Sequence, residues 1–287
     1  SMADAISVLG DLYLQQTDYS DALSLFNQAL SIFHTLHGEA ANHADIVRIL
    51  NRLGELYSEQ NNTTQAITYY HQALTMSSAM YSNNDNQIET ANTLYHLGYE
   101  YYKQNNFTRA YDYCNRALAI QSVIYGENIA HDETAAVLTI LSIIYLMRGD
   151  LINSEKFLNQ ALTMSYAIYG STSCHRNIAN ILKLFGFIYY FKGDSTQARI
   201  QCNQALTMFH TMYGENTNHI DIANALYELG DLDFSENKNE DAFIQYNQAL
   251  QIYRAIYGDS ANHRNIALAL KQLASVYSAQ RGQPGYM

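Results

Sequence analysis

The chain has 287 residues and a formal net charge of −11. An acidic surface repels phosphate backbones, so nucleic-acid binding is not expected. No run of about 18 apolar residues predicts a membrane-spanning helix, and one proline with 14 glycines gives too few turn residues for a many-stranded β fold.

A repeat of 44 residues runs through nearly the whole chain. The dipeptide Ala-Leu recurs once in each unit, at Ala29-Leu30, Ala73-Leu74, Ala117-Leu118, Ala161-Leu162, Ala205-Leu206 and Ala249-Leu250. A second column in the same register is always small: Gly10, Gly54, Gly98, Ser142, Gly186, Gly230 and Ala274. A fixed period of this length indicates stacked units, each of which buries its apolar face only against its neighbours.

Each unit is predicted to form two helices joined by a tight turn. In the second unit, apolar residues at 3- and 4-residue spacing mark one buried face over residues 46–57 and another over residues 66–74. The turn needs a left-handed backbone conformation, which asparagine and glycine tolerate well. The predicted turn positions are Thr17, Asn61, Asn105, Gly149, Gly193 and Asn237.

The first helix of a unit is predicted to begin at an asparagine cap. Asn42 with Asp45, and Asn218 with Asp221, fit an N-cap followed by a first-turn acid. A histidine follows this position in most units: His43, His131, His175, His219 and His263. Equivalent residues of stacked helices lie roughly 10 Å apart, whereas zinc ligands must lie within about 2.0–2.1 Å of one ion. The histidines therefore predict loop packing or helix-start hydrogen bonds, and no metal site.

The columns Leu-Gly-x-x-Tyr, then Ala, a large apolar residue and Ala, resemble the tetratricopeptide repeat. The long unit with Tyr-Gly and then His resembles the kinesin-light-chain and nephrocystin-like subclass. This resemblance implies an all-α, right-handed superhelical solenoid whose first helices line a concave groove for a protein or peptide. Kinesin light chains hold cargo with an asparagine pair, which is not kept here: the matching pairs are Asn51-Arg52, Tyr95-His96, Thr139-Ile140, Lys183-Leu184 and Tyr227-Glu228.

The repeat predicts a single domain of six units with a capping helix at residues 263–280. The tail, residues 281–287, is expected to be disordered. The units are predicted at residues 3–42, 43–86, 87–130, 131–174, 175–218 and 219–262.

The resemblance also predicts which residues face the groove. Segments 135–146 and 181–191 are apolar nearly all round, which indicates a partner surface in a single-layer stack. We hypothesise that a peptide with apolar anchors binds there and that the acidic N-terminal end favours a basic residue. Alternatively, the aromatic side chains fill a tight superhelix and contact one another. The predicted groove residues are Glu55, Tyr95, Tyr99, Tyr102, Ile143, Leu146, Met147, Lys183, Phe187, Tyr190, Phe191, Tyr227, Asp231 and Phe234.

No catalytic motif is present in the sequence. There is no phosphate-binding loop, no HExxH and no nucleophile elbow, so neither an enzyme nor a cofactor is expected. Some tetratricopeptide-repeat proteins bind the C-terminal carboxylate of heat-shock proteins with a clamp of several polar and basic residues. Lys183 is the one candidate for such a clamp in this sequence, so a heat-shock-protein tail is not expected as the ligand. Asp233 interrupts a set of equivalent tyrosines, and two interpretations remain open: a solvated, weakly packed turn, or a docking patch for a basic partner. The tyrosines of this column are Tyr13, Tyr57, Tyr101, Tyr145, Tyr189 and Tyr277.

The cysteines do not predict a disulfide framework, since their number is odd and the chain is large. Cys114 and Cys202 fall in an apolar column and are expected to be buried, while Cys174 lies in a loop. No secretory leader is visible, and a cytoplasmic location is expected. Two alternatives to the scaffold function are self-association through an unpaired end of the array, and service as a regulatory or sensor segment of a larger multidomain protein.

Overall fold

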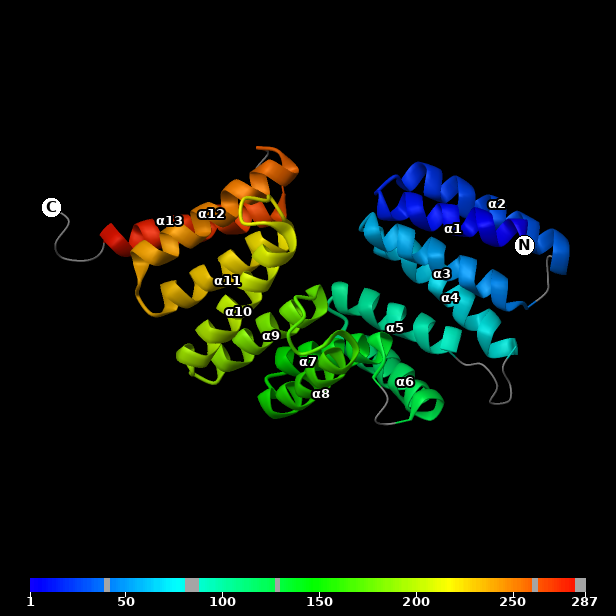
Figure 1. Ribbon diagram of the computed structural model, residues 1–287, viewed down its shortest axis with the longest axis horizontal. Coiled ribbons are helices and arrows are strands. Elements are labelled where there is room, and N and C mark those ends of the chain that lie inside the picture. The colour runs from blue at the N-terminus through cyan, green and yellow to red at the C-terminus, as the bar shows by residue number, and fades with distance from the viewer. Residues whose placement is uncertain (39–41, 81–87, 127–129, 260–262, 282–287) are drawn as a thin grey trace. The chain divides into compact units, whose positions relative to one another are not determined.

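A computed structural model describes residues 1–38, 42–80, 88–126, 130–259 and 263–281 (Figure 1). The described residues form helices and no strands. The helices are α1 (Met2–Gln15), α2 (Tyr19–His37), α3 (Ala44–Glu59), α4 (Thr63–Met80), α5 (Ile88–Lys103), α6 (Phe107–Tyr125), α7 (Asp132–Met147), α8 (Leu151–Tyr169), α9 (Arg176–Phe191), α10 (Ser195–Tyr213), α11 (Ile220–Ser235), α12 (Asn239–Tyr257) and α13 (Arg264–Arg281).

The chain is an all-α helical-repeat solenoid. It divides into two compact units, each much larger than a single 44-residue repeat, and these are called unit 1 and unit 2 from here on. Unit 1 spans Ser1–Arg148 and holds α1 to α7, and unit 2 spans Gly149–Met287 and holds α8 to α13. Within each compact unit, the first and second helices of a repeat pack together, as in α3 with α4 and α11 with α12, and successive helix pairs pack side by side. The capping helix is α13, which includes Arg281 and packs against α12. The remainder of the predicted disordered tail lies outside the described residues.

The predicted left-handed turns are confirmed at every position. The φ angles are 62° at Thr17, 57° at Asn61, 58° at Asn105, 77° at Gly149, 80° at Gly193 and 60° at Asn237. The residue that follows most of these turns has a role that was not predicted from the sequence. It is an aspartate or asparagine whose side chain accepts the N–H three residues on and so caps the second helix: Asp18, Asn62, Asn106, Asp150 and Asp194.

The predicted asparagine caps of the first helices are wrong, because the adjacent histidine is the cap. His43 Nδ1 accepts the backbone N–H of Asp45 at 3.3 Å, and His219 Nδ1 accepts that of Asp221 at 3.2 Å. An imidazole one residue nearer the helix reaches a first-turn N–H that Asn42 and Asn218 do not. His175 and His263 make the same bond, which is one of the two roles predicted for these histidines, whereas His131 is the N-cap residue of α7 without a side-chain cap bond.

An aromatic ring from the end of the preceding helix holds each capping histidine in place. Tyr213 and His219 stack with ring centroids 3.5 Å apart. The other tyrosine–histidine stacks, at 3.4–3.5 Å, are Tyr125–His131, Tyr169–His175 and Tyr257–His263. The residues at the two ends of a connecting loop therefore fix how the next repeat begins.

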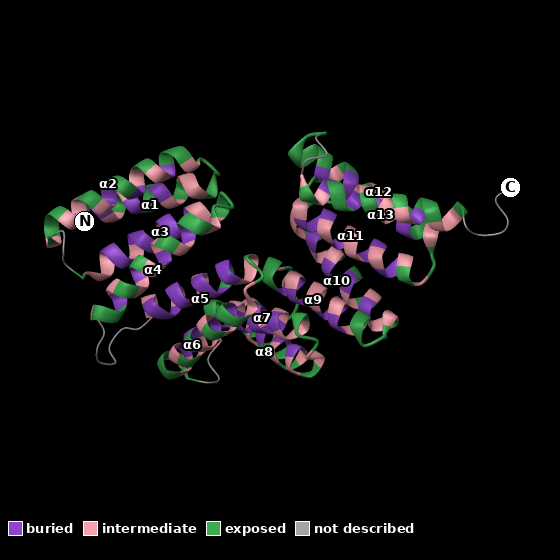
Figure 2. Cartoon of the chain, turned by 180° about the vertical axis from the view of Figure 1, so that it is seen from behind, coloured by how far each residue is buried: buried purple, intermediate pink, exposed green. Residues whose placement is uncertain are grey.

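The buried face of each helix is turned toward its neighbours (Figure 2), and the small column makes room for a large side chain. A Cβ at Gly54 would lie 2.5 Å from the ring of Tyr70, and one at Gly230 would lie 2.7 Å from that of Tyr246. Cys114 and Cys202 fill the same space in two other repeats and are buried, as predicted. In the described residues, no helix is both long enough and apolar enough to cross a bilayer.

Candidate partner-binding site

The predicted groove residues all lie on first helices, and each of them keeps some solvent exposure. Tyr99 is 39% exposed, Met147 58%, Tyr190 37% and Phe191 62%. The remaining members are half-buried. They fall into two groups, one on α3, α5 and α7 of unit 1 and one on α9 and α11 of unit 2.

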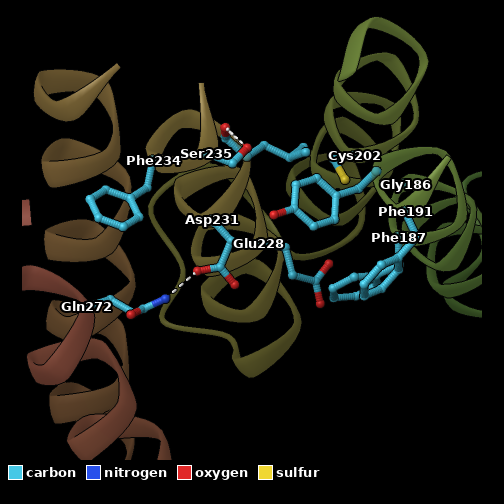
Figure 3. A pocket seen from close by; sticks show the side chains of 11 residues that line it. Gly186, Phe187, Phe191, Cys202, Glu228, Asp231, Phe234, Ser235 and Gln272 are labelled. Atoms are coloured by element: carbon cyan, nitrogen blue, oxygen red, sulfur yellow. Dashed lines mark hydrogen bonds between the residues drawn. The ribbon is translucent and has the colours of Figure 1, made fainter. Parts of the chain in front are cut away.

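Unit 2 contains a cavity of about 470 Å³ between α9 and α11 (Figure 3). Predicted groove residues form its aromatic walls and part of its floor: Phe187, Tyr190, Phe191, Asp231 and Phe234. Residues that the groove prediction missed complete the lining: Gly186, Cys202, Glu228, Leu232, Ser235 and Gln272. The structure does not place Lys183 or Tyr227 in the lining.

The polar side of this cavity carries two carboxyl groups on one face of α11. Glu228 Oε1 pairs with Lys183 Nζ at 3.0 Å, and Glu228 Oε2 is buried without a hydrogen-bond partner among the described residues. Asp231 Oδ1 accepts hydrogen bonds from Tyr246 Oη at 2.6 Å and from Gln272 Nε2 at 2.8 Å. Figure 3 shows both carboxyl groups between the Gln272 side chain and the Phe187 ring.

Burial acts against the ionised form of both groups. It raises the pKa of Glu228, with Lys183 opposing the shift, and it raises the pKa of Asp231, with the bonds from Tyr246 and Gln272 opposing it. The cavity thus combines aromatic surface with two carboxyl groups that have too little counter-charge. The single lysine also explains why a carboxylate clamp is not formed, because Lys183 is already paired.

The acidic end of the groove in unit 1 is arranged differently, because its carboxylates have basic partners. Arg52 lies 3.2 Å from Asp11 (Nε to Oδ1) and 2.7 Å from Glu55 (Nη1 to Oε2). His96 Nε2 lies 3.2 Å from Glu55 Oε1. Burial alone would raise the pKa of Glu55, but His96 and Arg52 outweigh it and lower that pKa to about 2. Glu55 is therefore held in its ionised form by its neighbours, whereas burial raises the pKa of Asp11 despite the nearby Arg52.

The aromatic residues of α5 contact one another. The rings of Tyr99 and Tyr102 lie 6.3 Å apart, and Tyr102 lies 6.4 Å from Phe107. Lys103 Nζ lies 5.6 Å from the centre of the Tyr99 ring. In this part of unit 1 the groove side chains pack on their neighbours, which is the alternative that the sequence left open.

The expectation of a solvated turn at Asp233 is wrong. Asp233 is only 2% exposed, and its Oδ1 lies 2.7 Å from Arg199 Nη1. Arg199 also holds Glu236 at 2.6 Å. Aspartate replaces the tyrosine of the column here because an arginine on α10 supplies the charge that makes its burial tolerable. The Asp233 carboxylate is consequently occupied and is not offered to a partner.

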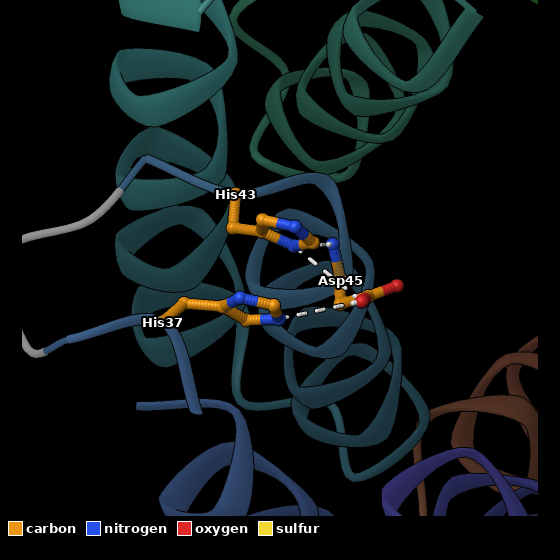
Figure 4. Close-up of side chains that lie close together, drawn as sticks. All are labelled: His37, His43 and Asp45. Carbon is orange, nitrogen blue, oxygen red and sulfur yellow. Dashed lines mark hydrogen bonds and ion pairs between the residues drawn. The ribbon is translucent and has the colours of Figure 1, made fainter. Parts of the chain in front are cut away.

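One cluster has the composition of a metal site. His37, His43 and Asp45 bring their ligand atoms within 4.8 Å of one another (Figure 4). However, the two imidazoles stack with centroids 3.5 Å apart and planes 10° from parallel, while a metal ion must lie close to the plane of each ring that binds it. His43 Nδ1 is also engaged by the Asp45 N–H. His37 here takes the place of the stacking tyrosine of other loops.

Comparison with known proteins gives the same architecture. A family model described as tetratricopeptide repeat matches residues 1–79, 89–167 and 177–255, and a second model of that description matches residues 51–123. No curated protein matches the sequence.

Similar solved structures share the fold at low identity. BtubC (BKLC) from P. vanneervenii has 16% identity and a TM-score of 0.62, with 92% of this chain and 96% of that one covered. A putative kinesin light chain of Podosopora anserina has 15% identity and a TM-score of 0.56, covering 76% and 99%. The pilF protein of Pseudomonas aeruginosa has 19% identity and a TM-score of 0.55, covering 94% and 97%.

Proposed function

The chain belongs to the tetratricopeptide repeat family, and from this premise we propose that it is a non-enzymatic scaffold or adaptor for another protein. Its ligand is a peptide segment with apolar anchors, bound along the first helices. The observation that carries this proposal is the aromatic cavity of unit 2. Its walls are built by residues that the family resemblance predicts to face the groove, and Tyr190 and Phe191 remain 37% and 62% exposed.

The energetics favour a peptide over a large rigid surface. Aromatic side chains offer contact area at low entropic cost, and tyrosine adds a hydrogen-bonding group. A cavity of about 470 Å³ accommodates one or two large side chains. Burying two or three anchors at about 1.5–3 kcal/mol each, less the cost of ordering the peptide, gives an affinity of roughly micromolar order.

The test is a peptide-display selection against the full chain, followed by binding measurements on Phe187→Ser. This change removes one cavity wall and should weaken a selected peptide by about tenfold or more. Phe243→Ser is the matched control, since Phe243 is an exposed aromatic residue of α12 outside the cavity lining. If F187S lowers the melting temperature but leaves peptide binding unchanged, the aromatic residues serve packing alone and the proposal fails.

A second candidate function is self-association through α1. Met2, Leu9 and Leu12 of this helix are 69%, 44% and 49% exposed, whereas the corresponding Ile46, Leu53 and Leu56 of the second repeat are buried. An apolar face of this kind commonly marks an interaction surface. Light scattering over a range of concentrations tests it: association that Leu9→Glu abolishes supports the candidate, and a concentration-independent monomer excludes it.

A further inference from the structure

The second and sixth repeats place corresponding residues in corresponding positions, four repeats apart. Gly54 and Gly230 both leave room for a tyrosine ring, which is Tyr70 in one repeat and Tyr246 in the other. Glu55 corresponds to Asp231, and each of these follows its glycine directly. His96 corresponds to Gln272, and each contacts that carboxylate from the next first helix.

At one of the corresponding positions, a basic residue in the second repeat is replaced by an acidic residue in the sixth. Arg52, which neutralises Asp11 and Glu55, corresponds to Glu228. The sixth repeat therefore carries two acids, spaced three residues apart on α11, where the second repeat carries an acid and a base. Lys183 from α9 pairs with Glu228 at 3.0 Å, whereas the hydrogen-bond donors to Asp231 are the uncharged Tyr246 and Gln272, so a single lysine faces both acids of α11.

A half-buried acidic pair is unfavourable unless something supplies the missing charge. Glu228 is 12% exposed, its Oε2 has no hydrogen-bond partner among the described residues, and it lines the cavity. A cation entering between α9 and α11 would meet this oxygen and the Asp231 carboxylate. It would at the same time lie against the Phe187, Tyr190 and Phe234 rings that also line the space.

We propose that the cavity between α9 and α11 receives a basic side chain of the bound peptide, arginine in preference to lysine. This inference rests on the proposed function and names the residue type that its unit 2 cavity selects. A guanidinium is planar, stacks on aromatic faces and directs several N–H donors at neighbouring carboxylates. An ammonium is a strongly hydrated point charge and exploits the aromatic walls less well. A basic residue of the peptide was expected to bind at the acidic N-terminal end of the groove. We assign its binding instead to the carboxyl groups of the sixth repeat.

The experiment uses defined peptide pools and the full chain. Each pool is a heptapeptide with a fixed central residue and an equal mixture of Leu, Phe, Tyr, Ala and Ser at the other six positions. The central residue is arginine, lysine, the neutral isostere citrulline, or glutamate. Retention of each pool is measured on immobilised wild-type protein and on the variants Asp231→Asn and Glu228→Gln. Glu155→Gln serves as the matched control, because Glu155 is a lysine-paired glutamate of unit 2 outside the cavity lining.

Wild type and E155Q should retain the arginine pool at least tenfold more strongly than the citrulline pool, with lysine between them and glutamate weakest. D231N and E228Q should retain the arginine and citrulline pools nearly equally. D231N keeps an acceptor for Tyr246 and Gln272, so it remains informative if E228Q leaves Lys183 unpaired and fails to fold.

Three outcomes overturn the inference and are distinguishable from one another. Equal retention of all four pools on wild type means that apolar anchors suffice, so the proposed function stands and the basic-residue inference falls. No retention of any pool means that both fall. An arginine preference that persists undiminished in D231N and E228Q also overturns the inference, because the preference then arises elsewhere on the acidic surface.

Discussion

The second and sixth repeats share a packing arrangement but differ in electrostatics. Both seat a tyrosine ring over a glycine and hold the carboxylate after that glycine from the next first helix. In the second repeat, Arg52 and His96 both contact the Glu55 carboxylate and hold it in its ionised form. In the sixth repeat, Glu228 occupies the position equivalent to Arg52. It pairs with Lys183 through Oε1, and its Oε2 has no hydrogen-bond partner among the described residues. A repeat scaffold can thus keep its packing while a few exchanges, Arg52 to Glu228 and His96 to Gln272 among them, change the charge around the same carboxylate.

The largest effect is expected from Glu55→Gln. Its pKa of about 2 in the folded protein lies below the ordinary value of 4.5, so ionised Glu55 stabilises the fold. The loss at neutral pH should be on the order of 2 kcal/mol. A depressed pKa stabilises above pH 4.5, and this contribution is lost as the pH falls from about 4.5 toward about 2.

Urea unfolding of wild type and E55Q at several pH values measures this effect. The difference in unfolding free energy should be full at pH 7 and should shrink steadily below pH 4.5. A difference that stays constant down to pH 3 would contradict the assignment of Glu55 as the charge that Arg52 and His96 stabilise.

Asp231→Asn is expected to leave the free energy of unfolding unchanged or to raise it slightly, which is a smaller effect of opposite sign to that of Glu55→Gln. The pKa of Asp231 is raised, chiefly by burial, so its ionised form costs stability above the folded pKa, and the cost is relieved as the pH falls through it. Asparagine keeps the acceptor for Tyr246 and Gln272. Unfolding at pH 7 should show D231N as stable as wild type or more stable by up to about 1 kcal/mol. A clear destabilisation would show that the two clusters are not electrostatic opposites.

The smallest effect is expected from His37→Tyr. Tyrosine at the equivalent position stacks on the capping histidine in other loops, and Tyr213 also donates a hydrogen bond to Asp221 at 3.0 Å. A tyrosine at position 37 can stack on His43 and donate a hydrogen bond to Asp45. The free energy of unfolding, measured by thermal unfolding, should therefore change by less than about 0.5 kcal/mol. Zinc chloride should not raise the melting temperature of wild type above that of H37Y. A zinc-dependent rise in wild type alone would show that the stacked rings separate to bind metal.

Much of the fold follows from periodicity in the sequence. The interhelical turns were predictable because a tight αα turn needs a left-handed residue, and Asn61 and Gly193 sit at a repeating position that meets this need. The side-chain caps were only partly predictable. Asparagine is a common N-cap, but the stacked Tyr213 ring holds His219 over the free N–H instead, and this contact joins two helices across a loop.

The site was predictable in outline and not in its charges. The family resemblance predicts that Phe187, Tyr190 and Asp231 face a groove, and the structure lines one cavity with them. At Glu228 the sequence shows only that the asparagine pair of kinesin light chains is not kept. It does not show which partner the Glu228 carboxylate contacts in the folded protein. The same reason explains Asp233, whose burial depends on Arg199 from another helix.

The stack of tyrosine on histidine has a consequence for engineering. Because each join is made by residues within a few positions of the loop, a segment cut between equivalent points carries its own connection at both ends. Copying residues 175–218 in tandem should therefore lengthen the array by one module without new interface design. Arrays of graded length could then space two cargo-binding modules at chosen intervals.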